Sequence, residues 1–313
     1  MIELEDVRVA EKRIAGQVRR TPVMAATALQ QPISEARVSL KLELFQPTGS
    51  FKARGATNKL RATPPEQLAK GIVTASGGNH GLATARAGKL AGVPTTIFLP
   101  ENVSPPKLAK LKKWGADIRI VGKVWDESNV AALKFAEETG AAYFHPFADP
   151  LIAAGQGTVG LEILDDLPDV DTILVAIGGG GLISGLSVAV KALKPNVRII
   201  GIEPVGAPTL HDSLKAGKVV TLEKVTTCVP TMAAARTDEK VFEIVRKHVE
   251  TIVLLTDDEM KEAARWLWFE LGIAADLSGA ASIAALMSGK FKAASSSHVC
   301  ALICGAGPDG ISE

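Results

Sequence analysis

Short apolar segments alternate along the chain with longer segments in which apolar residues recur every three or four positions. The first kind is typical of buried strands and the second of helices. The candidate strands are Val38–Leu44, Gly71–Ala75, Pro94–Leu99, Ile118–Val121, Ala141–Phe144, Thr172–Ile177, Val197–Ile202 and a last strand in the apolar run His298–Cys304. The candidate helices are Ala53–Arg61, Leu82–Ala91, Pro106–Trp114, Asp126–Thr139, Thr158–Leu167, Ile183–Leu193 and Thr256–Leu271. Strands that alternate with helices predict the α/β class, with a parallel sheet covered on both faces.

The composition predicts a folded chain of one large or two medium domains. Of the 313 residues, 47% are hydrophobic and 22% charged, whereas disorder requires low hydrophobicity. The 35 basic and 34 acidic residues give a net charge of +1, which indicates neither nucleic acid nor a membrane as a partner. The apolar runs are too short to span a bilayer, the first residues lack a signal core, and the three cysteines form no CxxC pair. These absences favour a cytoplasmic protein.

The first candidate site follows the strand Val38–Leu44, where residues 46–55 read QPTGSFKARG. A turn delivers Ser50, Phe51 and Lys52 to the start of a helix, and Ser50 is the expected N-cap. Lys52 then lies in the first helical turn, where the helix dipole disfavours a cation and lowers the lysine pKa. Schiff-base and proton-transfer lysines need such a pKa. Taken alone, a solvated surface lysine is the simpler explanation.

The second candidate site is the segment Ser76–Gly81, SGGNHG, which again joins a strand to a helix. Backbone N–H groups at such a turn form an anion site that suits a carboxylate. Asn79 could donate a hydrogen bond to a ring hydroxyl. His80 could serve as a general base, although a helix-capping role explains it as well.

The third candidate site is the run of four glycines, Gly178–Gly181, between a strand and a helix. Bare backbone amides and a helix N-terminus predict a phosphate site. A dinucleotide fingerprint, GxGxxG, fails because its last glycine would fall on Ile183 or Ser184, although Glu203 stands at the separation expected for a ribose contact. No Gly-Lys-Ser/Thr follows the glycines, so a P-loop is excluded, and no HExxH or CxxC metal pattern occurs.

Together these segments resemble the fold-type II pyridoxal-phosphate (PLP) enzymes, and most closely their serine/threonine dehydratase (threonine ammonia-lyase) and serine racemase group. The resemblance runs from Arg20-Thr21-Pro22 to Cys304-Gly305 and includes the segment Ala154–Thr158. It implies two parallel-sheet βα domains of the tryptophan synthase β-like class, with the cofactor in the cleft between them. Residues 1–65 and 148–313 would form a discontinuous large domain that binds PLP, and residues 66–147 a small domain that carries the substrate loop.

The resemblance also assigns roles to residues. Lys52 would be the Schiff-base lysine, with Phe51 against one face of the ring, and Asn79 would bind the ring 3-hydroxyl. Cys304 would face the pyridine nitrogen, although a buried core cysteine is the alternative. The phosphate would be bound by Gly178, Gly179, Gly180, Gly181 and the amide of Leu182. The substrate carboxylate would be bound by Ser76, Gly77, Gly78, Asn79 and His80.

The implied function is elimination of water from a small β-hydroxy amino acid, L-threonine and/or L-serine, to give a 2-oxo acid and ammonia. A thiol is a weak donor, so it would leave the ring nitrogen largely unprotonated and favour prompt loss of the hydroxyl after α-proton removal by Lys52. The alternatives are dehydration of 3-hydroxyaspartate or another hydroxy-amino acid (including one derived from hydroxyectoine), racemisation, and β-replacement. The pattern Lys52-Ala53-Arg54 favours elimination over β-replacement. A PLP-binding protein without turnover is the non-enzymatic alternative.

Several positions depart from the group's pattern. Gly77 stands where racemases of the group carry a serine that acts on the second face of the substrate, which disfavours racemisation. Glu203 and the carbonyl of Ala207 match the group's metal site, but Thr209 replaces its aspartate, so no metal is expected.

Two more departures lie near the expected substrate. Asp276 replaces a glutamate in the segment DLSGA, and Phe147 replaces an asparagine in HPF. The cofactor segment is followed by few residues, so we expect a catabolic type without a regulatory domain. The family implies a homodimer that acts on a small molecule.

Overall fold

The structure of the protein is a computed structural model that describes residues 1–27, 29–101, 103 and 105–311. Its strands form two sheets, a larger one in the order β1-β2-β10-β7-β8-β9 and a smaller one in the order β5-β4-β3-β6. The strands of the larger sheet are β1 Val23–Ala25, β2 Arg37–Lys41, β7 Thr172–Ala176, β8 Arg198–Pro204, β9 Thr251–Leu255 and β10 His298–Leu302. Those of the smaller sheet are β3 Ile72–Ala75, β4 Thr95–Leu99, β5 Asp117–Ile120 and β6 Ala142–Tyr143.

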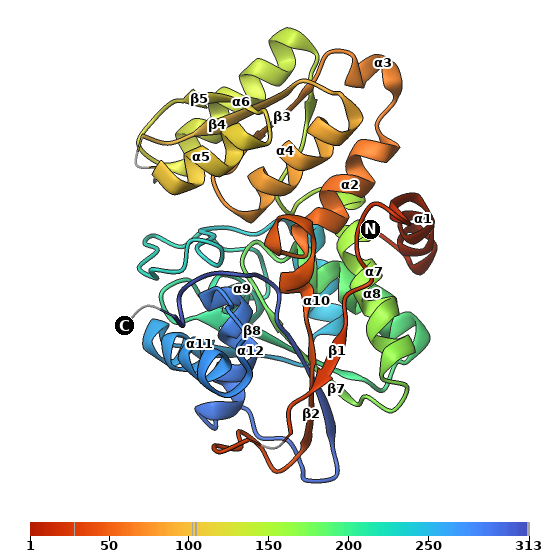
Figure 1. Cartoon of the computed structure of the whole chain (residues 1–313), viewed down its shortest axis with the longest axis vertical. Helices are drawn as coiled ribbons and strands as arrows, with labels where there is room; N and C mark the ends of the chain where they lie inside the picture. The colour runs from red at the N-terminus through yellow and green to blue at the C-terminus, as the bar shows by residue number, and fades with distance from the viewer. Residues whose placement is uncertain (28, 102, 104, 312–313) are drawn as a thin grey trace.

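Every neighbouring pair of strands is parallel except β1 and β2, which are antiparallel. Helices cover both sheets, and Figure 1 shows the smaller sheet with α3 to α6 stacked above the larger sheet. The helices are α1 Leu4–Ile14, α2 Lys52–Ala62, α3 Pro65–Leu68, α4 Asn79–Ala91, α5 Pro105–Lys113, α6 Trp125–Thr139, α7 Pro150–Asp166, α8 Gly181–Leu193, α9 Thr209–Ala216, α10 Glu239–His248, α11 Asp257–Leu271 and α12 Leu277–Met287. The predicted α/β class with parallel sheets is confirmed.

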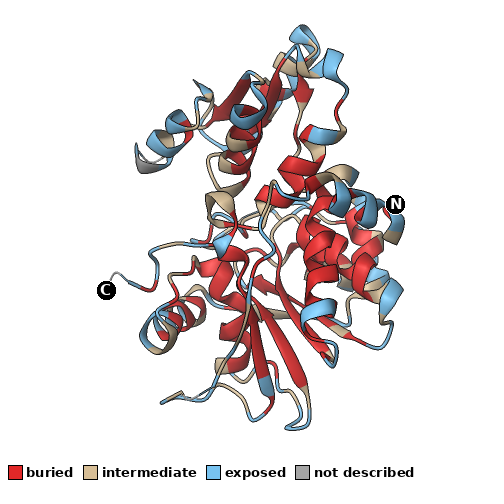
Figure 2. Ribbon diagram, turned by 45° about the vertical axis from the view of Figure 1, so that its right-hand side comes forward, coloured by how far each residue is buried: buried red, intermediate tan, exposed pale blue. Residues whose placement is uncertain are grey.

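The most buried strands of the larger sheet are the two at its centre. β7 and β10 are buried at every position, as expected for parallel strands covered on both faces, and the buried residues concentrate there in Figure 2. The strands of the smaller sheet lie between residues 72 and 143, and those of the larger sheet lie between 23 and 41 and between 172 and 302. Both sheets therefore fall inside the predicted domain ranges, while the boundaries at 65/66 and 147/148 stay a prediction.

The predicted strand Val38–Leu44 is shorter than expected. It ends at Lys41 and continues into a 3₁₀ turn over Glu43–Phe45. Its alternation of apolar and polar residues does not separate core from solvent, because Ser39, Lys41 and Glu43 are as buried as the leucines between them. These polar side chains can be buried because each has a polar partner inside the protein. The partner of Lys41 is Glu162 of helix α7.

Helix α7 begins at Pro150, well before its predicted start at Thr158. The side chain of Asp149 caps it by accepting the amides of Leu151 and Ile152, and the glycines that follow hide the helical pattern in the sequence. A Cβ at Gly155 would meet the backbone of α2 at 2.7 Å, so the glycine allows the two helices to touch. The elements α1, β1, α3, α9, α10, β9 and α12 were not predicted.

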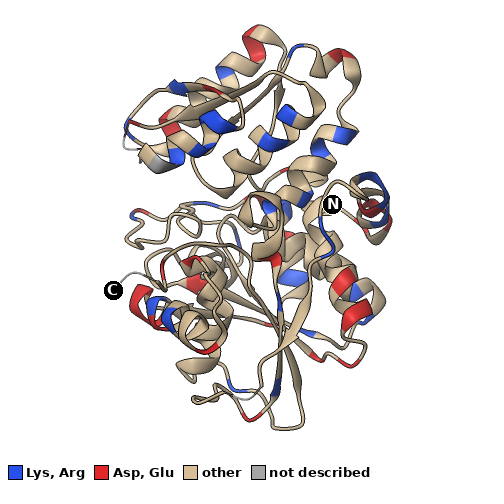
Figure 3. Ribbon diagram, viewed as in Figure 1, with Lys and Arg blue, Asp and Glu red and all other residues tan. Residues whose placement is uncertain are grey.

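Charged residues of both signs are spread over both parts of the molecule, as Figure 3 shows. Among the described residues, no helix is long and apolar enough to cross a membrane. Of the two tryptophans on α11, Trp266 is buried as expected of a core residue, and Trp268 is 43% exposed.

Candidate active site

The start of α2 lies beside the end of β10. Ser50 and Gly305 form an antiparallel bridge, and the amide of Phe51 donates to the carbonyl oxygen of Cys304 at 3.2 Å. These contacts bring Lys52 and Cys304 into one site, as the resemblance requires. The prediction that Ser50 caps α2 is wrong: the N-cap position is Phe51, and the buried hydroxyl of Ser50 has no hydrogen-bond partner among the described residues.

The amine of Lys52 has a carbonyl and an aromatic ring as neighbours. Its Nζ donates to the carbonyl oxygen of Pro146 at 2.7 Å and lies 5.1 Å from the ring centroid of Phe51. Lys52 forms no ion pair with any carboxylate of the described residues. Burial lowers the pKa of Lys52 to about 8. The sequence analysis predicted a lowered pKa from the helix dipole, whereas in the structure the main cause of the lowered pKa is the removal of the amine from water.

The segment Ser76–Gly81 follows β3 and leads into α4. A Cβ at Gly81 would collide with the carbonyl oxygen of Ser76, so only glycine permits this turn. The ring of His80 is buried, and its Nε2 lies 3.0 Å from the carbonyl oxygen of Phe144, to which it donates. Burial and the charge of Lys52 lower the pKa of His80 to about 3, so the ring is neutral. The side chain does not cap α4.

Asn79 begins α4 and reaches across to the larger part of the molecule. Its Nδ2 donates to Oδ2 of Asp276 at 3.1 Å, over a sequence separation of 197 residues. Asp276 is the N-cap of α12, and Ser278 in the first turn of α12 lies 3.7 Å from the thiol of Cys304. The predicted ring contacts, Asn79 and Cys304, are therefore joined through Asp276 and Ser278.

The glycine run ends at the N-terminus of α8. Gly180 is the N-cap with φ of 91°, and α8 starts at Gly181, so the first amides of the helix lack intrahelical partners and suit an anion. Close contacts also require these glycines, because a Cβ at Gly179 would collide with the ring of Phe147, and one at Gly178 would collide with the carbonyl of Thr231.

The segment His145–Ala148 connects Lys52 with the glycine run. Nδ1 of His145 accepts the amides of Phe147 and Ala148 at 3.2 and 2.8 Å, which fixes the turn. The carbonyl of Pro146 in this turn receives Lys52, and the ring of Phe147 covers the glycines. The segment His145–Ala148 thus brings the predicted phosphate site and the predicted Schiff-base lysine together. Of its residues, the sequence analysis had noted only Phe147, because it replaces an asparagine of the group's pattern.

Glu203, which matches the group's metal site in the sequence, binds backbone amides in the structure. Both carboxylate oxygens of Glu203 accept backbone amides at 2.8 Å, from Leu210 and His211. Burial raises the pKa of Glu203 to about 8. Among the described residues, no group of three or more His, Cys, Asp or Glu could hold a metal ion.

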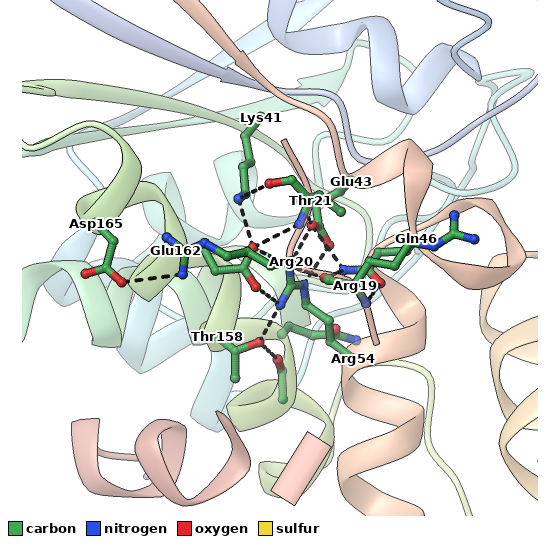
Figure 4. A network of polar contacts seen from close by, with 12 residues as sticks. Arg19, Arg20, Thr21, Lys41, Glu43, Gln46, Arg54, Thr158, Glu162 and Asp165 are labelled. Atoms are coloured by element: carbon green, nitrogen blue, oxygen red, sulfur yellow. Dashed lines mark hydrogen bonds and ion pairs between the residues drawn. The ribbon is translucent and has the colours of Figure 1, made fainter. Parts of the chain in front are cut away.

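A second charged residue of α2, Arg54, joins the helix to a network of buried polar side chains (Figure 4). Its guanidinium makes two hydrogen bonds of 2.7–2.8 Å to each of two buried carboxylates, Glu43 and Glu162. Lys41, which is fully buried, joins the network through Glu162 at 2.8 Å and Asp166 at 3.1 Å. The sequence reasoning missed this network, although the charged residues within an apolar strand were a signal of it.

These residues fit a PLP cofactor. Lys52 offers an amine of lowered pKa, the N-terminus of α8 offers amides for a phosphate, and Phe51 offers an aromatic face. Two buried polar atoms that have no partner among the described residues lie close to Lys52 in the sequence, namely Oγ1 of Thr48 and Oγ of Ser50. A buried polar atom without a partner is costly, which is consistent with a site built to receive a ligand.

The fold and this arrangement define a fold-type II PLP enzyme, and the sequence profile of the family "pyridoxal-phosphate dependent enzyme" matches residues 14–305, so the chain belongs to that family. It is 40% identical over 296 residues to an L-threonine ammonia-lyase of Geobacter sulfurreducens, covering 95% of this chain and 73% of the relative. The solved structure of maize serine racemase is 37% identical with a TM-score of 0.93, covering 97% of this chain and 93% of that one. The solved structure of T.th. threonine deaminase is 34% identical with a TM-score of 0.91, covering 97% and 98%.

The predictions of fold class, cofactor and a PLP-dependent enzyme are therefore confirmed, and the relatives named ammonia-lyases support the predicted reaction class. The roles of the individual residues, from Lys52 to Cys304, stay predictions.

Proposed function

We propose that this protein eliminates water from a small β-hydroxy amino acid, L-threonine and/or L-serine, and releases a 2-oxo acid and ammonia. The relatives named threonine ammonia-lyase and catabolic threonine dehydratase support the reaction. The observation that carries the proposal is the Lys52 amine, which donates to the Pro146 carbonyl and whose pKa burial lowers to about 8. At neutral pH such an amine is close enough to its pKa to lose and regain a proton.

Each residue then has a task. PLP supplies an electron-accepting ring when it is bound. Lys52 removes the α-proton with its neutral amine, the β-hydroxyl takes up one proton and leaves as water, so that the proton lost from the α-carbon is balanced, and the released unsaturated amine reacts with water to give the 2-oxo acid and ammonia. The segment Ser76–His80 binds the substrate carboxylate, and the neutral ring of His80 is held by its hydrogen bond to the carbonyl oxygen of Phe144.

The test is a panel of substrates with 2-oxo acid and ammonia as readouts. The panel holds L-threonine, L-serine, 3-hydroxyaspartate and a hydroxy-amino acid derived from hydroxyectoine. We expect turnover of L-threonine or L-serine, and complete loss of it in Lys52→Ala. Lys59→Ala is the matched control, because Lys59 lies on the same helix but pairs with Asp149 at 2.8 Å. If no member of the panel yields a 2-oxo acid, the proposal is wrong.

Racemisation is the second candidate, since the relatives include serine racemases. Gly77 provides no hydroxyl for the second face of the substrate, so we expect the remaining serine to keep its configuration. A chiral assay on the same samples measures this, and accumulation of D-serine faster than pyruvate would favour the racemase.

We also propose a cytoplasmic homodimer. Trp268 and Phe269 of α11 are 43% and 70% exposed, and neighbouring exposed aromatic side chains are typical of contact surfaces between proteins. Sedimentation equilibrium of the holoenzyme tests the assembly, and a species with the mass of one chain would overturn it.

A further inference from the structure

The carboxylate of Asp276 lies between two parts of the site that the proposed function leaves unconnected. Its Oδ1 accepts the hydroxyl of Ser278 at 2.7 Å and the amide of Gly279 at 2.6 Å. Its Oδ2 accepts Nδ2 of Asn79 at 3.1 Å. Burial raises the pKa of Asp276 above its ordinary value, and these three donors oppose the rise. Three donors around one carboxylate are the hydrogen-bonding pattern of the ionised form.

Close backbone contacts fix the position of this carboxylate. A Cβ at Gly305 would lie 2.5 Å from Oδ2, and a Cβ at Gly307 would lie 2.7 Å from Cβ of Asp276. The amide of Asp276 donates to the carbonyl oxygen of Gly305 at 3.0 Å. Glycines at 305 and 307 thus leave the room that the Asp276 side chain occupies, and the three donors hold its carboxylate there.

The contact with Asn79 fixes the orientation of an amide. One N–H of Nδ2 donates to Asp276, so the nitrogen, and not the oxygen, must face this side. Among the described residues the second N–H of the same nitrogen has no acceptor, so it can donate to a ligand in the site. A flipped amide would set its oxygen against the carboxylate, and the repulsion between two acceptors disfavours that state.

The contact with Ser278 fixes the orientation of a thiol. Because the single hydrogen of the Ser278 hydroxyl is donated to Asp276, its oxygen can only accept from Cys304, whose Sγ lies 3.7 Å away. The thiol hydrogen therefore points at Ser278, and the sulfur presents lone pairs elsewhere. Burial raises the pKa of the Cys304 thiol, and the charge of Asp276 raises it further.

We propose that Asp276 is a positioning residue that sets the orientation of the two side chains predicted beside the cofactor ring, the Asn79 amide directly and the Cys304 thiol through Ser278. This inference rests on the predicted places of Asn79 and Cys304 beside the PLP ring, and not on the substrate or the reaction of the proposed function. It also changes the expectation for Cys304: the thiol is not even a weak donor to the ring nitrogen, because its hydrogen is committed to Ser278. The ring nitrogen is left without a proton donor, which suits elimination.

The first test uses the cofactor-free protein and no amino-acid substrate. The rate at which iodoacetamide alkylates Cys304 is followed by peptide mass spectrometry between pH 7 and 10. In Asp276→Asn the loss of a nearby negative charge should raise the thiolate fraction about tenfold, the equivalent of about one pKa unit. In Ser278→Ala the neutral thiol loses the acceptor of its hydrogen, so the thiolate fraction and the rate should rise.

Asp309→Asn is the matched control. Asp309 accepts the amide of Leu277 at 3.0 Å, next to Asp276, and within the described part of the chain it makes no hydrogen bond with Asn79 or Ser278. Its substitution should change the alkylation rate by less than about twofold. Equal rates in Asp276→Asn and the unmodified protein would overturn the proposal.

The second test measures the dissociation constant of PLP by quenching of tryptophan fluorescence. Asn79→Ala and Asp276→Asn should each weaken binding about tenfold, as expected for one hydrogen bond to the ring, and the double variant should be no weaker than either one. Additive losses would show that Asp276 does not act through Asn79. Both tests can succeed if every substrate of the panel fails, so the two proposals are tested separately.

Discussion

Lys52 and Arg54 lie two residues apart in the first turn of α2, yet the protein treats their charges in opposite ways. Burial alone would lower the pKa of Arg54, but the charges and hydrogen bonds of Glu43 and Glu162 raise it above its ordinary value. Lys52 has a carbonyl as its partner instead of a carboxylate, and burial lowers its pKa to about 8. Carboxylate partners therefore decide whether a cation removed from water keeps its charge, and helix α2 contains an example of each outcome.

Because of this difference, Arg54 has a structural role and Lys52 is free to have a chemical one. The Arg54 network holds the start of α2 to β2 and α7 through paired charges. Lys52 projects from the anchored turn with an amine that can change its protonation state. A rigid support next to a reactive group is what precise positioning requires.

The largest effect is expected from removing the anchor. Arg54→Met leaves the buried carboxylates of Glu43 and Glu162 without their main partner, so the free energy of unfolding should fall by about 3–5 kcal/mol. Urea unfolding of the cofactor-free protein measures it. Arg198→Met is the control, because the Arg198–Glu250 pair is exposed and should contribute less than about 1 kcal/mol. A loss below about 1 kcal/mol in Arg54→Met would contradict the role of the network.

A smaller effect of opposite sign is expected from removing the cation that has no carboxylate partner. The folded-state pKa of Lys52 lies below its unfolded value, so the protonated amine destabilises the fold fully below about pH 8, and the cost disappears as pH rises toward 10.5. Lys52→Met should therefore stabilise the cofactor-free protein by about 1–3 kcal/mol at pH 7 and by less at pH 9.5.

The control for that experiment is Lys134→Met, since Lys134 is exposed and its substitution should change stability by less than about 0.5 kcal/mol at either pH. Equal stabilisation by Lys52→Met at both pH values would mean that folding does not lower the pKa of the Lys52 amine. The measurement is again urea unfolding.

The smallest effect concerns the pH dependence of turnover. If Lys52 removes the α-proton, only its neutral form is active, so kcat should rise up to tenfold per pH unit below about pH 8 and level off above it. A stopped assay of 2-oxo acid between pH 6 and 9.5 measures the profile. A flat profile would assign the base to another group.

The sequence predicted the fold because buried parallel strands are continuous apolar runs, as in Thr172–Ile177, which contains β7. It predicted the site segments because each joins a strand to a helix. It missed the partners that only the folded chain brings together: Arg54 and Glu162 are 108 residues apart, and Asn79 and Asp276 are 197 residues apart. No local pattern reports such pairs, and the alternation in β2 was misleading because its polar side chains are buried too.

The position of β10 has a consequence for how the protein is made. This strand pairs with β2 on one side and β7 on the other, so it lies in the middle of the larger sheet although its residues are synthesised late. Until residues 298–302 leave the ribosome, the nascent chain carries two open strand edges and a gap where Cys304 belongs. Open strand edges are prone to pair with other chains, so the larger sheet is protected from such pairing only once β10 has been inserted.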